Sequence, residues 1–163
     1  MKTHSLLVLA AMLGCLAVTG CQQRESPTVA KSEEAAADVE LGEARLTLPA
    51  VKGNPGAAYF TVVNRTAQPL SLIGVEVAGA ERTEMHDGGG ANMTQVDRVT
   101  VPAGGNVAFI PTGYHAMVFG VPASLKVDGH AQITLKFEDG RRVSASAQVR
   151  APGMAETDHG ATH

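Results

Sequence analysis

Residues 133–149 read ITLKFEDGRRVSASAQV, and this stretch decides the fold class. The odd positions of 133–137 are apolar, and the odd positions of 143–149 are again Val or Ala, with Ser and Gln between them. Side chains of a strand alternate between its two faces, so both segments are predicted to be half-buried strands. Asp139-Gly140 lies between them, and Asp-Gly is a strong signal for a tight turn. The stretch therefore predicts a β-hairpin.

Segments upstream of this hairpin also have strand character. Pro, Gly or Asn punctuates most of the gaps between them, as in Pro102-Ala103-Gly104-Gly105, and no helical stripe of two turns is present. Several short strands at this spacing predict an all-β domain, built as a Greek-key sandwich or barrel. The predicted strands cover residues 58–64, 70–77, 81–86, 98–101, 106–110 and 115–121.

The first 20 residues have the build of a secretory signal peptide. A short basic start is followed by an apolar run that is too short for a confident membrane span. The run ends in Val18-Thr19-Gly20-Cys21, which resembles the lipobox of bacterial lipoproteins. We therefore predict acylation of Cys21 and a periplasmic, lipid-anchored protein, with a simple signal peptide cut nearby as the alternative. Gln22, rather than Asp, follows the cysteine and favours the outer membrane over the inner one.

Composition divides the rest of the chain into a tether, a domain and a tail. Residues 21–38 are polar and read as a flexible tether, residues 39–150 have the size of one domain, and residues 151–163 form a tail. Cleavage before Cys21 would leave one cysteine, which excludes a disulfide within the mature chain. The formal net charge is −3 and no basic stripe is present, so nothing points to nucleic acid.

The predicted domain gathers its methionines and most of its histidines into one pattern. The pattern is Met85-His86, then Met93, then His115-x-Met117, and the domain contains no cysteine. Thioether and imidazole without thiolate form the ligand set that a soft, monovalent metal prefers, and Cu(I) is the biological candidate.

Strand geometry ranks these residues. His115 and Met117 are two positions apart and should share a face, whereas Met85 and His86 should point in opposite directions. We favour His86 as the ligand because it borders the Gly88-Gly89-Gly90 turn, and Met93 returns from that same turn. Met85 is then a core residue, with metal binding by Met85, in addition to His86 or in its place, as the alternative.

The surrounding sequence resembles a known family. Three segments carry the resemblance: GNPGAAYF at 53–60, VPAGG at 101–105 and GYHAMVFG at 113–120. Together with the 21 residues between Met93 and His115, they look like the PCu(A)C family of periplasmic copper chaperones. The resemblance covers about residues 46–149. It implies a cupredoxin-like β-sandwich that binds Cu(I) and passes it toward the copper centres of cytochrome oxidase, either to an oxidase subunit or to another copper chaperone. Carried over by position, the ligands are His86, Met93, His115 and Met117.

The remaining candidates are weaker. His130 begins a predicted strand far from the others and is interpreted as structural. The tail contains Met154, His159 and His163, which either are solvated or capture a second copper ion, including Cu(II).

Functions of other classes remain as alternatives. Hydrolase, metalloprotease, phosphate-loop and thiol-redox motifs are all missing, so the protein is predicted not to be an enzyme. Glu84 and Asp87 flank His86, but carboxylates beside a ligand are commonplace. A copper buffer for resistance and a metal-free structural lipoprotein module are the alternatives to a copper carrier.

Overall fold

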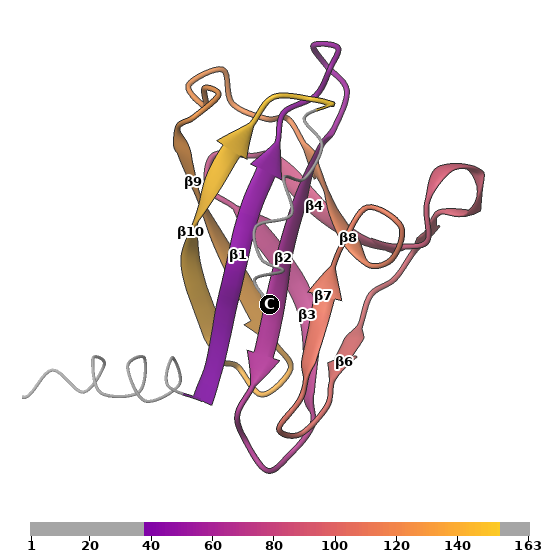
Figure 1. Cartoon of the computed structure of the whole chain (residues 1–163), viewed down its shortest axis with the longest axis vertical. Coiled ribbons are helices and arrows are strands. Elements are labelled where there is room, and N and C mark those ends of the chain that lie inside the picture. The colour runs from indigo at the N-terminus through magenta and orange to yellow at the C-terminus, as the bar shows by residue number, and fades with distance from the viewer. Residues whose placement is uncertain (1–37, 154–163) are drawn as a thin grey trace, which may run out of the picture.

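The computed structural model describes residues 38–153, which form one curled β-sheet (Figure 1). Ten strands pair in the order β5-β4-β8-β2-β1-β10-β9-β3-β6, with β7 pairing to β2 off this path. Their bounds are β1 Val39–Thr47, β2 Gly56–Asn64, β3 Leu70–Val77, β4 Arg82–Asp87, β5 Thr94–Gln95, β6 Val99–Val101, β7 Asn106–Phe109, β8 His115–Phe119, β9 His130–Phe137 and β10 Arg142–Arg150. The all-β class predicted from the sequence is confirmed.

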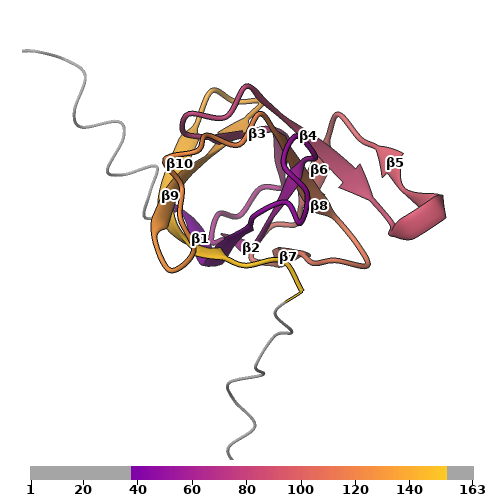
Figure 2. The ribbon, with the colours of Figure 1, turned by 90° about the horizontal axis from the view of Figure 1, so that it is seen from above.

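The sheet curls around a shared interior. Seen from above in Figure 2, the strands run around a ring-shaped outline, and β3 contacts β4 where the sheet curls back. All pairings are antiparallel except that of β1 with β10, which is parallel. Most spatial neighbours are far apart in the chain, as in β4 beside β8 and β8 beside β2. The residues of β4 and β8 therefore become neighbours only in the folded protein.

The hairpin predicted from 133–149 is confirmed as β9 and β10. Val143 pairs with Leu135 and Ala145 pairs with Ile133. Gly140 at the turn has φ +86°, a left-handed conformation that glycine adopts without a steric penalty. The alternation also holds, because the odd-numbered apolar side chains of 133–137 are all buried.

The core is a single cluster of aliphatic and aromatic side chains. Phe60 of β2 stacks on Phe109 of β7 with ring centroids 4.3 Å apart and planes 18° apart. Met85 belongs to this cluster, with 5 % of its surface exposed. Asn64 and His115 are buried polar residues among the described ones, and the Asn64 amide donates to the carbonyl oxygens of Gln68, Val101 and Pro102.

Two strands were not among those predicted. In β1, the register with β2 shifts between Gly42 and Arg45, and Glu43 has φ +50°. Because of this bulge, Val39 and Leu46 are both buried although they are seven residues apart, an odd spacing that regular alternation would place on opposite faces, so the two-residue period is lost. The strand β5 has only two residues and is too short to show a period. Within residues 38–153, no helix has the length and apolar character that crossing a membrane requires.

Candidate metal centre

The candidate site is built on the antiparallel pair of β4 and β8. His86 is the register partner of His115, and two residues along, Glu84 is the partner of Met117. Side chains alternate along a strand, so these four share one face of the pair. The residues between them, Met85 and Ala116, are register partners on the opposite face and are buried in the core.

The two histidines form the centre of this face. Their ring centroids are 5.8 Å apart and the ring planes differ by 27°. His115 is 3 % exposed, and the His86 side chain is 15 % exposed. The pair is therefore largely shielded from water while one ring keeps limited access to it.

Hydrogen bonds determine which ring nitrogens are free. Nδ1 of His115 lies 2.9 Å from the carbonyl oxygen of Gly113, and because a carbonyl only accepts, Nδ1 carries the proton. The neutral ring then has its lone pair on Nε2. A backbone carbonyl that orients a histidine in this way is a common outer partner of metal-binding imidazoles.

His86 has the opposite arrangement. Its Nε2 lies 3.4 Å from the carboxylate oxygen Oε2 of Glu84, whereas its Nδ1 is buried and has no hydrogen-bond partner. A buried polar atom without a partner is unfavourable and rare in folded proteins. A metal ion accepted at Nδ1 would satisfy that atom, so the donor set fits a bound cation.

Met93 approaches from the loop after β4. It follows the short 3-10 turn η1 (Gly90–Asn92) and precedes β5, where Gln95 is the register partner of His86. The backbone of Met93 is extended, with φ −74° and ψ 128°, so alternation from Gln95 places Met93 on the His86 face. Met93 is 37 % exposed. Figures 1 and 2 both show this segment standing away from the body of the curled sheet.

Close backbone contacts define this loop. Gly88 has φ +84°, and a Cβ there would lie 2.6 Å from the carbonyl oxygen of Asn92. A Cβ on Gly89 would lie 3.2 Å from the carbonyl oxygen of Pro111. The loop that carries Met93 therefore packs on the loop that leads into β8 and His115.

A charged pair borders the histidines. Nε of Arg82 donates to Oε1 of Glu84 over 2.9 Å, and the Arg82 guanidinium lies 3.8 Å from the ring centroid of Phe119. The Arg82 hydrogen bond holds the pKa of the Glu84 carboxyl below its ordinary value, so this group is a carboxylate near neutral pH. Among the described residues, no three His, Cys, Asp or Glu side chains assemble into a group that could hold a metal.

The other predicted residues lie elsewhere. Met85 is in the core and faces away from the histidines, and His130 is the exposed first residue of β9, opposite Gln148. Cys21, Met154, His159 and His163 lie outside the described residues. Sequence reasoning passed over Glu84 and Arg82 as parts of the site. Their signal was the same two-residue spacing, Arg82-x-Glu84-x-His86, that marked His115 and Met117.

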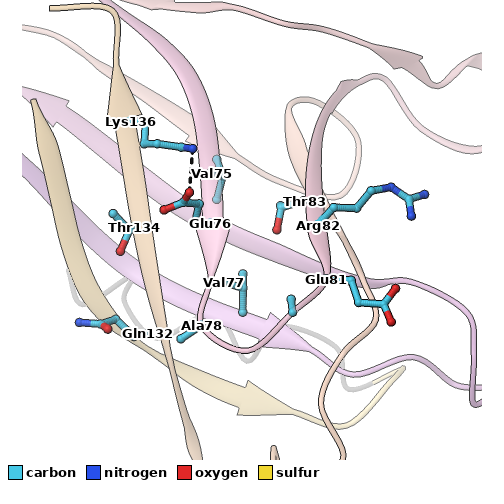
Figure 3. Close-up of a pocket in the computed structure, with 11 residues that line it drawn as sticks. Val75, Glu76, Val77, Ala78, Glu81, Arg82, Thr83, Gln132, Thr134 and Lys136 are labelled. Carbon is cyan, nitrogen blue, oxygen red and sulfur yellow. Dashed lines mark ion pairs between the residues drawn. The ribbon is translucent and has the colours of Figure 1, made fainter. Parts of the chain in front are cut away.

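A separate pocket of about 530 Å³ lies where β3, β4 and β9 meet (Figure 3). Glu76 and Lys136 form an ion pair of 2.7 Å at its wall, and Gln132, Thr134 and Thr83 also line it. None of the four predicted ligands is among its lining residues. Arg82, which borders the histidines, also lines the pocket, so the two features adjoin along β4.

Comparisons with known proteins agree with this architecture. Residues 32–149 match the family model described as "Putative lipoprotein LpqE-like". A protein of Leifsonia xyli subsp. xyli, named "Putative lipoprotein Lxx21020", is 26 % identical over 157 residues, which cover 91 % of this chain and 92 % of that protein.

Solved structures of PCuAC domains share the fold. The copper-bound PCuAC domain of PmoF2 matches with a TM-score of 0.62 and 26 % identity, over 71 % of this chain and 94 % of that one. The Cu(I) form of DR1885 from Deinococcus radiodurans matches with a TM-score of 0.57 and 31 % identity, over 74 % of this chain and 85 % of that one. These likenesses confirm the expected cupredoxin-like fold. The chain belongs to the LpqE-like/PCuAC family, as its sequence pattern predicted.

Proposed function

We propose that this protein binds Cu(I) through His86, Met93, His115 and Met117 and carries it to a copper acceptor. The observation that supports this most strongly is the histidine pair on one sheet face, beside Met117, with one ring nitrogen free on each ring. Two similar structures, the copper-bound PCuAC domain of PmoF2 and the Cu(I) form of DR1885, support the choice of metal.

The donor set suits the reduced ion. Cu(I) is soft and accepts thioether sulfur together with imidazole nitrogen, whereas Cu(II) prefers nitrogen and oxygen donors in a tetragonal array. A site with two thioethers therefore favours the monovalent state. Binding also requires imidazoles with a free lone pair, so protons compete with copper for the two histidines, whereas the thioethers do not bind protons.

Transfer proceeds by stepwise ligand exchange at the exposed side of the site. Met93 is 37 % exposed, and Ile110, in the adjoining loop before β8, is 43 % exposed. These apolar side chains give an acceptor a surface to contact beside the ligands. The acceptor is proposed to be a cytochrome oxidase subunit or another copper chaperone, and the protein acts as a carrier rather than an enzyme.

The carrier is proposed to work from a membrane surface. Acylation of Cys21 would anchor it in the periplasm, at the outer rather than the inner membrane, with residues 22–38 as a tether. Membership of a family described as lipoprotein-like supports the anchor. The tail residues Met154, His159 and His163 are proposed as a second, weaker copper site that also accepts Cu(II).

The first experiment is an anaerobic Cu(I) titration of residues 21–163 against a chromogenic Cu(I) chelator. Cys21 is replaced by serine throughout, because a free thiolate would itself bind Cu(I). We expect tight one-to-one binding that His115→Ala weakens at least about tenfold. His130→Ala is the matched control, since His130 is exposed at the start of β9, and it should leave the affinity unchanged. Equal binding by both variants would refute the site.

A second experiment separates a carrier from a buffer. The loaded protein is mixed with a copper-binding oxidase fragment, with and without a membrane that retains protein but passes free copper. A carrier transfers copper faster when the two proteins can touch. Equal rates in both arrangements would support the copper buffer instead. Removing residues 154–163 should abolish any second equivalent of bound copper and leave the first.

A further inference from the structure

A row of three side chains runs along one face of β4. Arg82, Glu84 and His86 alternate on that face, with 2.9 Å from Arg82 Nε to Glu84 Oε1 and 3.4 Å from Glu84 Oε2 to His86 Nε2. The two carboxylate oxygens therefore serve different neighbours. One is taken by the guanidinium, and the other faces the imidazole.

Arg82, the first residue of the row, contacts the neighbouring strand β8. Phe119, the register partner of Arg82, places its ring 3.8 Å from the guanidinium carbon. In Figure 3 the Arg82 side chain points away from the Glu76–Lys136 ion pair of the neighbouring pocket. Contact with an aromatic face and a hydrogen bond to a carboxylate both favour this position of the guanidinium, although the Arg82 side chain is 56 % exposed.

The row has a consequence for the imidazole. A carboxylate only accepts hydrogen bonds, so the ring nitrogen that faces Glu84 must carry a proton. When His86 is neutral, its lone pair is then on Nδ1, which is the buried nitrogen without a partner. His115 has the reverse arrangement, because its Nδ1 proton is engaged by Gly113 and its lone pair is on Nε2.

We propose that Arg82 and Glu84 are positioning residues that hold His86 as its Nε2–H tautomer, so that Nδ1 is its copper-binding atom. The pair of histidines then presents two different ring nitrogens, one from each strand. The copper part of this inference rests on the proposed function, whereas the tautomer is a property of the metal-free protein.

The test is nitrogen-15 NMR of the histidine rings in the metal-free chain at about pH 8, where an ordinary imidazole is neutral. We expect the wild type to show a protonated Nε2 on His86, with its proton protected from exchange with water. Glu84→Ala should lose that protection and admit the Nδ1–H tautomer, and Arg82→Ala should do so partially. Glu84→Gln keeps a carbonyl acceptor and should retain the tautomer.

Controls make the result specific. Glu81→Gln removes a carboxylate next to β4 that is outside the row, and it should leave the His86 nitrogens unchanged. The His115 nitrogens report whether the face has stayed folded in each variant. A wild-type Nδ1–H tautomer, or a His86 spectrum that Glu84→Ala does not alter, would overturn the proposal.

Copper binding gives the second readout. Glu84→Ala should weaken Cu(I) affinity by about 10-fold, the usual effect of removing a partner that orients a metal-binding histidine. Nδ1 of His86 should be the nitrogen whose resonance shifts on loading, and a shift at Nε2 instead would overturn the assignment. If the wild type binds no Cu(I), the proposed function fails, and the tautomer measurement by itself decides whether the row positions His86.

Discussion

Glu84 of β4 and Met117 of β8 are register partners, so a carboxylate and a thioether stand side by side next to the histidine pair. The two side chains have different roles. Glu84 is hydrogen-bonded to Arg82, whereas Met117 supplies a sulfur on the same face as His115. A carboxylate lies within the site without being needed as a ligand for a soft metal.

Met117 and Met85 offer a matched pair of substitutions. Met117→Leu removes a sulfur from the histidine face and should weaken Cu(I) binding at least about tenfold, because leucine has no donor atom. Met85→Leu makes the same chemical change on the core face, where it should leave the affinity unchanged and alter stability by less than about 1.5 kcal/mol. Competition with a Cu(I) chelator and urea unfolding measure the two effects. Equal loss of affinity in both variants would contradict the assignment of faces.

Gly88→Ala should disturb the loop that carries Met93. Alanine is disfavoured at φ +84°, and its Cβ would lie 2.6 Å from the Asn92 carbonyl oxygen. We expect a loss of about 1–3 kcal/mol in stability and weaker Cu(I) binding. Gly90→Ala, at φ +59° with open space around it, imposes the backbone strain without the clash. Affinity that falls for both variants alike would show that the Gly88 contact does not matter.

Asn64→Ala should destabilise the fold without affecting metal binding. The buried amide of Asn64 donates to three backbone carbonyls, and its Oδ1 accepts from both the backbone and the hydroxyl of Thr66. Loss of these bonds should lower the free energy of unfolding by about 1–3 kcal/mol, measured in urea. Asn106→Ala, at an exposed position on β7, is the control and should change stability by less than about 0.5 kcal/mol.

Acid should weaken the ion-pair cluster on β3. Hydrogen bonds from Lys136 and then Arg142 hold the pKa of Glu76 below its ordinary value. A carboxyl with a lowered folded-state pKa stabilises the protein above its unfolded pKa, and this contribution disappears as pH falls through the folded pKa. The stability difference between wild type and Glu76→Gln should therefore be present at neutral pH and vanish in strong acid. The effect is small because the side chains are exposed.

The local features of the fold could be predicted from the sequence. The alternation of 133–149 and the Asp139-Gly140 turn identified a hairpin, since the whole signal lies within one short segment. His115 and Met117 were placed on one face for the same reason. By contrast, β1 was missed because its bulge breaks the alternation between Val39 and Leu46.

The assembly of the site depended on contacts that no local pattern encodes. His86 and His115 become neighbours only because β4 pairs with β8, in a register that buries Met85 and Ala116 together in the core. The roles of Arg82 and Glu84 depend on the same pairing, since Phe119 reaches Arg82 from β8. A two-residue spacing indicates which side chains of one strand share a face, but it does not identify the residues of the neighbouring strand that pair with them.

The position of β4 near the end of the sheet divides the four proposed ligands into two pairs that differ in local stability. His115 and Met117 are on β8, which has strands on both sides, whereas His86 and Met93 flank a loop whose only strand beyond β4 is the two-residue β5. Hydrogen exchange should accordingly be faster at β5 than at β8. The free energy needed to open the outer ligands is smaller than that needed to unfold the domain. One half of the site can thus fray and re-form while the other half stays in register, and the ion could be handed over without the scaffold coming apart.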